Sequence, residues 1–125
     1  MDTKQKITTH EQLIVWQKSM DLVDRVYTLT RAFPDSERFG LSQQMRRAAV
    51  SIPSNIAEGR VRSTTKDFIH FLHMASGSCA ELETQLNIAR RQRFIDDVTY
   101  NDVASLLAEV GKMTVSLISS LNARR

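Results

Sequence analysis

The fold is decided by residues 65–92, which read TKDFIHFLHMASGSCAELETQLNIARRQ. Apolar or small residues recur there at every third or fourth position: Phe68, Leu72, Ala75, Cys79, Leu82, Leu86 and Ala89. This spacing places them on one face of an α-helix, whereas a half-buried strand would alternate apolar and polar residues. We therefore predict a long amphipathic helix whose apolar face packs against other parts of the chain.

The same spacing recurs on both sides of this stretch. The further stripes are Leu13, Trp16, Met20, Val23 and Tyr27; Leu41, Met45, Ala48, Ala49, Ile52 and Ile56; and Val103, Leu107, Val110, Thr114, Leu117 and Leu121. No segment alternates convincingly with the period of a strand. We predict an all-α chain with helices over about 9–32, 42–58, 65–92 and 100–122.

Capping residues support these boundaries. A Ser or Thr three positions before an acidic residue can satisfy the free amides at the start of a helix. Three such pairs occur: Thr8 with Glu11, Thr64 with Asp67, and Thr99 with Asp102. Residues 33–40 contain Pro, Asp, Ser and Gly and predict a turn, and Gly59 suits a helix C-terminus.

Pro53 falls inside the second helix. Proline removes one backbone donor and clashes with the carbonyl four residues earlier, here that of Ala49. The helix can kink at this point, or end near Ser51 and begin again with Pro53 in its first position. We favour a kinked continuous helix, because Ile52 and Ile56 continue the apolar stripe through the proline.

Four helices with short connections most simply form an antiparallel up-down-up-down bundle. The first helix carries a second apolar stripe in addition to the first: Val15, Leu22, Val26, Leu29 and Phe33. Its apolar surface is therefore broader than a surface helix needs. The second stripe can pack against neighbouring helices of the same chain or against another subunit, and we favour a subunit interface.

Composition excludes several classes of protein. The chain has 125 residues, of which 42% are hydrophobic and 25% charged, as expected for one globular domain. The single cysteine, Cys79, excludes an intramolecular disulfide and an all-cysteine metal site. Neither a secretory leader nor an apolar run of membrane-spanning length is evident. We expect a soluble, cytoplasmic protein without membrane contact.

Three blocks resemble the proteins encoded in intervening sequences of 23S ribosomal RNA. They are VWQKSMDLV at 15–23; the stretch from Phe33–Pro34 through Phe39–Gly40–Leu41 to RRAAVSIPSNIAEG at 46–59; and FLHMASGSCAELETQL at 71–86. The resemblance covers about residues 13–89 in order, and SIPSNIAEG is its most specific part. The chain departs from it at 90–93, RRQR, where relatives often have an apolar helix end that contains glycine.

The resemblance implies an antiparallel four-helix bundle and a ring-shaped pentamer, with no established enzymatic activity. A related group, the accessory proteins of diversity-generating retroelements, binds RNA and reverse transcriptase. For this chain the resemblance therefore implies self-association and, by analogy only, an association with nucleic acid.

Basic residues gather at one end of the expected bundle. The N-terminus, the connection between the second and third helices, and the C-terminus would meet there and bring together Lys4, Lys6, Arg60, Arg62, Lys66, Arg124 and Arg125. Three acidic residues, Asp2, Glu58 and Asp67, oppose them. Lysine and arginine contacts to phosphate supply most non-specific affinity for nucleic acid, and free amides at the start of the third helix could hold a phosphate. Alternatively, these charges are only solvated.

Other arginines have structural interpretations. Arg90, Arg91 and Arg93 complement the dipole at a helix C-terminus. A second group consists of Arg46, Arg47, Glu81 and Glu83, which we expect to form ion pairs between helices or subunits. No aromatic residue is interleaved with a basic cluster in the sequence, so we expect no platform on which bases could stack.

No motif indicates catalysis, a metal or a cofactor. Asp67, His70 and His73 spread around the third helix rather than converging. Cys79 lies on the core stripe, where it acts as a small apolar residue, and Gly77 most simply permits a close helix approach. We expect a non-catalytic homo-oligomer, a pentamer by resemblance, that binds RNA or DNA through Arg60, Arg62 and Lys66. The alternative is a protein-protein adaptor without nucleic-acid binding.

Overall fold

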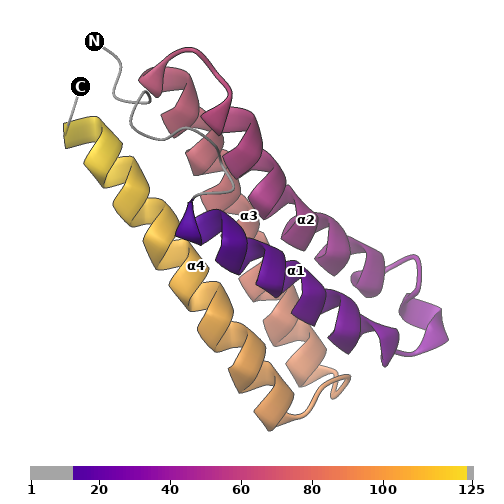
Figure 1. Cartoon of the computed structure of the whole chain (residues 1–125). Helices are drawn as coiled ribbons and strands as arrows, with labels where there is room; N and C mark the ends of the chain where they lie inside the picture. The colour runs from indigo at the N-terminus through magenta and orange to yellow at the C-terminus, as the bar shows by residue number, and fades with distance from the viewer. Residues whose placement is uncertain (1–12, 124–125) are drawn as a thin grey trace.

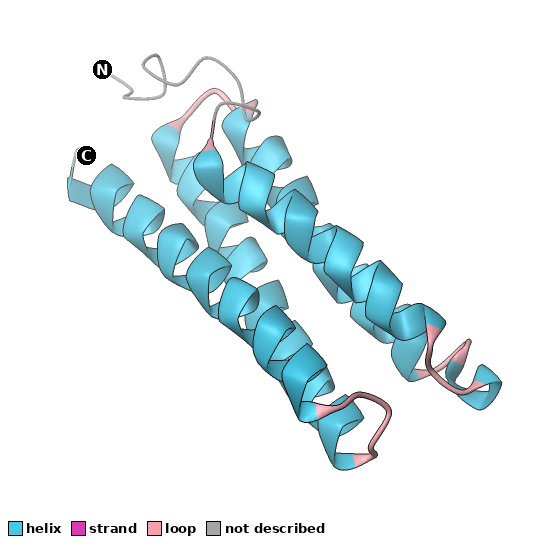
Figure 2. Ribbon diagram, turned by 60° about the horizontal axis from the view of Figure 1, so that its bottom comes forward, coloured by secondary structure: helices cyan, strands magenta, loops and turns pink. Residues whose placement is uncertain are grey.

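The chain forms an antiparallel four-helix bundle (Figure 1). The computed structural model describes residues 13–123. Its elements are α1 (Ile14–Arg31), the 3₁₀ helix η3 (Asp35–Glu37), α2 (Leu41–Arg60), α3 (Thr65–Arg91) and α4 (Asp97–Ala123). Each helix packs against the next one along the chain, and α4 closes the bundle against α1. Figure 2 shows helices joined by short loops, which confirms the all-α, up-and-down prediction.

The helices differ in length. Helices α3 and α4 have 27 residues each, whereas α1 has 18. As a result α1 runs beside only part of α4 (Figure 1). The predicted start of the first helix near residue 9 and the Thr8–Glu11 capping pair lie outside the described residues.

Apolar side chains from all four helices meet along the bundle axis. Twelve of the larger ones are less than 2% exposed: Phe68, Leu22, Met45, Ile52, Ile56, Leu72, Leu82, Leu86, Leu121, Val26, Val103 and Val110. Each helix thus contributes the face that its stripe predicted, with α1 as the exception. Burial of this apolar surface is the main stabilising contribution to the fold.

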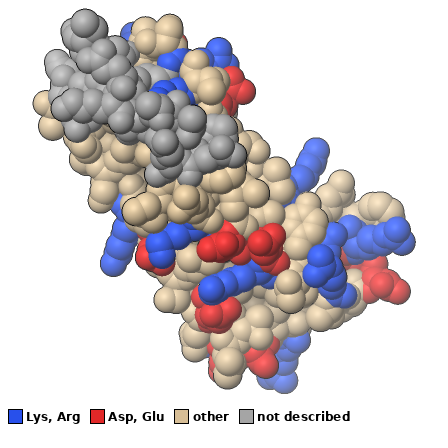
Figure 3. All heavy atoms as spheres, viewed as in Figure 1, with Lys and Arg blue, Asp and Glu red and all other residues tan. Residues whose placement is uncertain are grey.

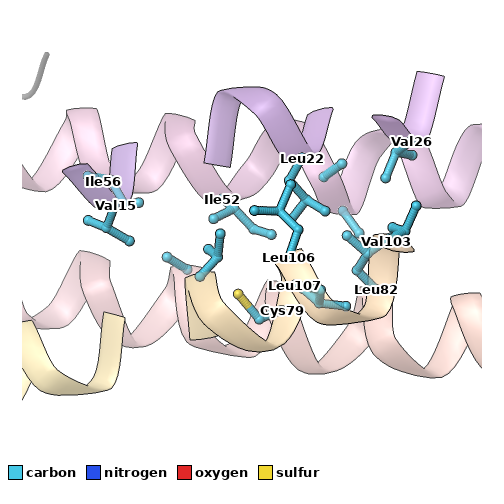
Figure 4. Packing of buried hydrophobic residues seen from close by; sticks show 14 of the residues in the cluster. Val15, Leu22, Val26, Ile52, Ile56, Cys79, Leu82, Val103, Leu106 and Leu107 are labelled. Atoms are coloured by element: carbon cyan, nitrogen blue, oxygen red, sulfur yellow. The ribbon is translucent and has the colours of Figure 1, made fainter. Parts of the chain in front are cut away.

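The prediction that the second stripe of α1 faces another subunit is wrong. Val15, Leu22, Val26, Leu29 and Phe33 are 0–6% exposed in the isolated chain. Figure 4 shows Val15, Leu22 and Val26 directed into the same core as residues of α2, α3 and α4. The stripe that we assigned to the core is the more exposed one. Its Met20 is 40% exposed, because α1 is rotated to direct the second stripe at the bundle axis.

The polar side of α1 is joined to α4 by two ion pairs. Lys18 Nζ lies 2.9 Å from Glu109 Oε2, and Arg25 Nη1 lies 2.9 Å from Asp102 Oδ1. Both pairs are partly exposed to solvent, and each is worth at most about 1 kcal/mol. Their main consequence is to set the register of two antiparallel helices.

One predicted capping pair is confirmed and another is corrected. The Thr64 hydroxyl accepts a hydrogen bond of 3.1 Å from the amide of Asp67, as the pattern at the start of α3 predicted. At α4 the cap is Asp96, whose carboxylate accepts from the amide of Thr99 at 2.7 Å. Thr99 therefore lies in the first turn, and α4 begins at Asp97 rather than near residue 100.

Helix α2 is continuous through Pro53, as predicted. The predicted kink stays a prediction. The amide of Asn55 donates from Nδ2 to the backbone oxygen of Ser51 at 2.8 Å and to the Ser51 hydroxyl at 2.9 Å. The same hydroxyl lies 2.8 Å from that of Ser78 on α3. This polar link ties the turn around the proline to the neighbouring helix.

Gly59 lies in the last turn of α2, in keeping with the prediction, but the close helix approach predicted for Gly77 occurs at Gly59 instead. Gly59 lies inside α2 without the positive φ of a left-handed cap. A Cβ at Gly59 would lie 2.8 Å from the Cβ of Phe71 and 3.2 Å from the backbone oxygen of Phe68, so this glycine permits the close approach of α2 to α3. At Gly77 a Cβ would meet no atom within 4 Å.

The turn that ends α3 has an arginine at a position where glycine is favoured. Arg93 has a φ of 63°, and the next amide, that of Phe94, donates back to the oxygen of Ala89 at 2.9 Å. This is the Schellman arrangement, in which the residue after a helix takes a left-handed conformation. The chain's departure at 90–93 from the pattern of the resemblance therefore puts a strained arginine at the left-handed position.

Helix α4 is the most apolar of the four. Its best 18-residue window has a mean hydropathy of 1.2, long and apolar enough to cross a membrane by length and composition alone. The expectation that no segment has membrane-spanning character is therefore corrected for α4. In the bundle its Val103, Val110 and Leu121 are at most 2% exposed, and 33% of that window is buried inside the structure.

Candidate nucleic-acid interface

The predicted basic residues at the α2–α3 connection lie close together but are partly compensated. Arg62 forms an ion pair of 2.7 Å with Glu58 one turn earlier, and its guanidinium lies 4.8 Å from the ring centre of Phe71. Arg60 is half-buried at the end of α2, and Lys66 is exposed in the first turn of α3. The other four predicted contacts, Lys4, Lys6, Arg124 and Arg125, lie outside the described residues.

The backbone amides at the start of α3, which were predicted to hold a phosphate, are partly used within the chain. The Thr64 hydroxyl already accepts from the amide of Asp67. The Asp67 carboxylate in the same turn adds a negative charge that opposes an anion. The structure thus weakens the prediction that free amides of this helix hold a phosphate.

Arg46 and Arg47 do not pair with Glu81 or Glu83 within the chain. Among the described residues, the ion pairs of arginine involve Arg25, Arg62 and Arg90 instead. Both glutamates are exposed on α3, whereas Arg46 is directed toward α1. The prediction of ion pairs within the chain is wrong, because the side chains of Arg46 and Arg47 are not directed from α2 toward the two glutamates on α3. Whether they pair between subunits stays a prediction.

A groove of about 640 Å³ follows the outer face of α2 beside the α1–α2 connection. We call it the α2 groove, and its lining residues are Tyr27, Arg38, Phe39, Gln43, Arg46, Arg47, Val50 and Ser51. Three of these are arginines, and none is an aspartate or glutamate. The groove is open to solvent along the helix, so an extended ligand could lie in it without any movement of the chain.

The guanidinium of Arg46 has a defined orientation in the α2 groove. Its Nε donates to the Thr30 hydroxyl at 2.8 Å, while the hydroxyl itself donates to the backbone oxygen of Val26 at 2.7 Å. The same guanidinium lies 4.6 Å from the ring centre of Tyr27. No acceptor among residues 13–123 uses its two terminal nitrogens, so the fork of donors that suits a phosphate is held ready.

Phe39 forms the end of the α2 groove. Its ring is 81% exposed, the largest value among the exposed large hydrophobic side chains of residues 13–123. The Arg38 guanidinium lies 5.4 Å from its centre. The chain is held here by Glu37, whose carboxylate accepts from the amide of Leu41 at 3.1 Å and so caps α2. Phe39 is thus presented to solvent beside a firmly anchored helix start.

Charged side chains gather at the end of the bundle with the α1–α2 and α3–α4 connections (Figure 3). The arginine at the end of α3 has a structural role. Arg90 Nε donates to Asp97 at 3.1 Å, and its guanidinium lies 4.3 Å from the ring centre of Tyr100. Arg90 thereby joins the end of α3 to the start of α4. Together with Arg91 it also complements the dipole at the end of α3.

Aromatic rings lie beside arginines in space although none is interleaved with the basic clusters in the sequence, and the expectation that bases find no stacking platform stays a prediction. Four arginines lie over aromatic rings: Arg38 over Phe39, Arg46 over Tyr27, Arg62 over Phe71, and Arg90 over Tyr100. Three of these pairs join residues that are at least nine positions apart in the chain. Linear spacing does not reveal them because packing and connections bring the partners together.

Three side chains of α3 are the groups whose chemistry was weighed in the sequence, namely His70, His73 and Cys79. Burial raises the pKa of the Cys79 thiol to about 11, so the thiol is protonated at neutral pH. His70 and His73 are exposed on α3. Within residues 13–123 no group of three or more His, Cys, Asp or Glu side chains could hold a metal ion.

Comparison with known proteins identifies the family. Residues 11–116 match the sequence profile described as 23S rRNA-intervening sequence protein. The chain belongs to this family. Among solved structures it is similar to a protein of unknown function from the S23 ribosomal protein family of Bacteroides thetaiotaomicron, with 27% identity and a TM-score of 0.79. That similarity covers 84% of this chain and 98% of the other. No curated protein matches the chain.

The block that carries the resemblance to the 23S rRNA-intervening sequence proteins contacts α3. Within SIPSNIAEG, Ser51 reaches Ser78 of α3 and Gly59 lets α2 approach Phe68 and Phe71. Its Asn55 holds the turn around Pro53. The block thus builds the contact of α2 with α3, and it adjoins the α2 groove at Ser51.

Proposed function

We propose that this chain is a non-catalytic protein that associates with RNA by binding its phosphate backbone. The observation that carries the proposal is the α2 groove, where three arginines line one surface without a carboxylate among them. Unopposed guanidinium groups attract a polyanion and release its counterions on binding. At the α2–α3 connection, by contrast, Glu58 already compensates Arg62. We therefore assign the larger contribution to the groove and the smaller one to Arg60, Arg62 and Lys66.

The test is binding of nuclease-treated protein to a structured RNA and to duplex DNA across a salt series. We expect an affinity that falls steeply as salt rises, because each phosphate contact contributes a slope of about −0.7 to −0.9 in log–log form. Reversal of charge in Arg38→Glu/Arg47→Glu should abolish binding, whereas Arg60→Glu/Arg62→Glu/Lys66→Glu should only weaken it. Lys112→Glu is the control, since Lys112 is exposed on α4 away from the groove.

The outcomes separate the proposal from its rival. Binding that is lost only in the α2–α3 variant would move the interface to that end of the bundle. No binding to either nucleic acid at low salt would overturn the proposal and favour a protein-protein adaptor.

We also propose that the chain assembles into a closed homo-oligomer, a pentamer by the resemblance. The second stripe of α1 is buried within the chain and cannot supply the interface. Exposed apolar side chains on α3 and α4 outside the groove remain available, namely Met74, Ile88 and Val115. Light scattering of the full chain gives its mass. A monomeric mass at high protein concentration would contradict this assembly.

A further inference from the structure

We propose that the α2 groove binds single-stranded rather than duplex RNA, with one base stacked on Phe39 and the adjoining phosphates on Arg46 and Arg47. This inference rests on the proposed function and specifies its ligand. The groove places an exposed ring and arginines on one surface. A single strand can meet both with a free base face next to a flexible phosphate backbone, whereas the base faces of a duplex are covered.

Phe39 supplies the stacking surface. An 81% exposed ring at the mouth of a groove gains from being covered by another flat apolar surface. The bases of a duplex are stacked on one another and cannot cover it, whereas an unpaired base can. The guanidinium of Arg38 lies over the ring, 5.4 Å from its centre, so the base would stack on the opposite face.

The arginines of the same groove supply the phosphate contacts. Gln43, Arg47 and Val50 follow Phe39 along the outer face of α2, and Gln43 to Ser51 spans about 12 Å of helix axis. Arg46 is oriented by Thr30 and Tyr27, with its two terminal nitrogens available. Arg47 is exposed and has no ion-pair partner among residues 13–123. One oriented and one adjustable guanidinium suit a backbone that passes along the helix.

The chemistry favours nucleic acid over an acidic peptide. An acidic peptide would be held by the charges alone and would leave Phe39 exposed, whereas a nucleotide segment uses both the arginines and the ring. The Arg46 fork also matches two oxygens of one phosphate, which a bidentate guanidinium binds more strongly than a single acceptor.

The experiment measures fluorescence anisotropy of a labelled single-stranded RNA of about 12 nucleotides and of the same strand in a duplex, with the full chain. We expect the single strand to bind at least ~5-fold more tightly than the duplex. Phe39→Ala should weaken single-strand binding by at least ~5-fold, the effect of one lost stacking contact. Phe39→Trp should restore it. Because the Phe39 side chain is almost wholly exposed, these variants should remain folded.

The charge contacts are tested separately. Arg47→Gln should reduce the salt slope for the single strand by about 0.7, and Arg46→Lys should weaken binding because lysine lacks the fork. Lys112→Gln removes the same charge from α4 outside the groove and should leave single-strand affinity within twofold.

Five results would overturn the inference. RNA binding that is insensitive to Phe39→Ala, or equal for strand and duplex, would refute it while leaving the proposed function in place. An acidic peptide that competes with the strand equally well in wild type and in Phe39→Ala would assign the groove to a protein partner. If Phe39→Ala instead changes the mass measured by light scattering, a second copy of the chain covers the groove. Absence of binding to any RNA would overturn both proposals.

Discussion

Replacing glycine by alanine at two positions inside helices should change stability in opposite directions. Gly59 in α2 faces α3, where an added Cβ would lie 2.8 Å from the Cβ of Phe71, 3.0 Å from Phe68 Cδ1 and 3.2 Å from the Phe68 backbone oxygen. At Gly77 in α3 the added methyl group would meet nothing within 4 Å. The two substitutions are chemically identical, so their difference isolates the packing between α2 and α3.

The magnitudes follow from two opposing effects. Alanine in a helix interior is favoured over glycine by about 1 kcal/mol, and Gly77→Ala should gain most of that free energy of unfolding. Gly59→Ala gains the same amount but overpacks the interface, which costs about 1–3 kcal/mol or more. Because two of its closest atoms belong to the α3 backbone or are attached to it, they cannot rotate away. We expect Gly59→Ala to be net destabilising and the two variants to differ by about 2–3 kcal/mol.

Urea unfolding followed by the helical circular dichroism signal measures both free energies. It should be repeated at two protein concentrations, since assembly would make stability depend on concentration. Gly111→Ala is a second control, because its methyl group would also meet no atom within 4 Å. Equal stabilisation by Gly59→Ala and Gly77→Ala would refute the close approach at Gly59. Destabilisation by Gly77→Ala alone would show that another molecule covers the open side of α3.

Four further predictions follow from single residues. Leu22→Ala should cost about 2–5 kcal/mol of unfolding free energy and Met20→Ala less than about 1 kcal/mol, as urea unfolding would show. A Leu22→Ala variant with unchanged stability but altered mass would restore the subunit interface for its stripe. Arg93→Gly should raise the unfolding free energy by about 1 kcal/mol, because glycine tolerates the φ of 63°; an unchanged or lower value would contradict the strain. Native Cys79 should react with a disulfide reagent at least ~100-fold more slowly than in urea, since its pKa is raised from 9.0 to about 11; equal rates would show that the thiol is accessible. The hydrogen bond from the Thr99 amide lowers the pKa of the Asp96 carboxyl, so the stability it adds is present above the unfolded pKa near ~4 and is lost as pH falls through the lower folded value. Thermal unfolding of wild type and Asp96→Asn, which keeps a capping acceptor without a charge, should therefore converge in acid, and a constant difference down to low pH would argue against this linkage.

Apolar periodicity was sufficient to predict the architecture. The stripe from Phe68 to Ala89 is buried throughout, and the capping pair of Thr64 and Asp67 begins α3 where expected. Caps were less reliable where two polar residues compete. Asp96 satisfies the amide of Thr99, and so α4 begins before the position that the Thr99–Asp102 pattern indicated.

The candidate site was harder to predict because it depends on contacts between distant parts of the chain. Arg46 and Arg47 were identified from the sequence as charged residues. Their predicted pairing with Glu81 and Glu83 assumed a side-chain direction that only packing determines. Tyr27 and Phe39 were missed as site residues. The signal that could have found them was the arginine next to Phe39 and the position of Tyr27 at the outer end of a stripe.

Local patterns in this chain specify its helices, since hydrogen bonds within a helix and the burial of one face depend on residues three and four positions apart. Short stretches of sequence likewise specify its turns and its family. Local patterns do not determine the rotation of each helix about its own axis. Both stripes of α1 satisfy the same periodicity, and the choice of Leu22 over Met20 for the core comes from the combined shape of α2, α3 and α4. That rotation also places Tyr27 and Thr30 beside Arg46, so the groove exists only once the four helices have packed.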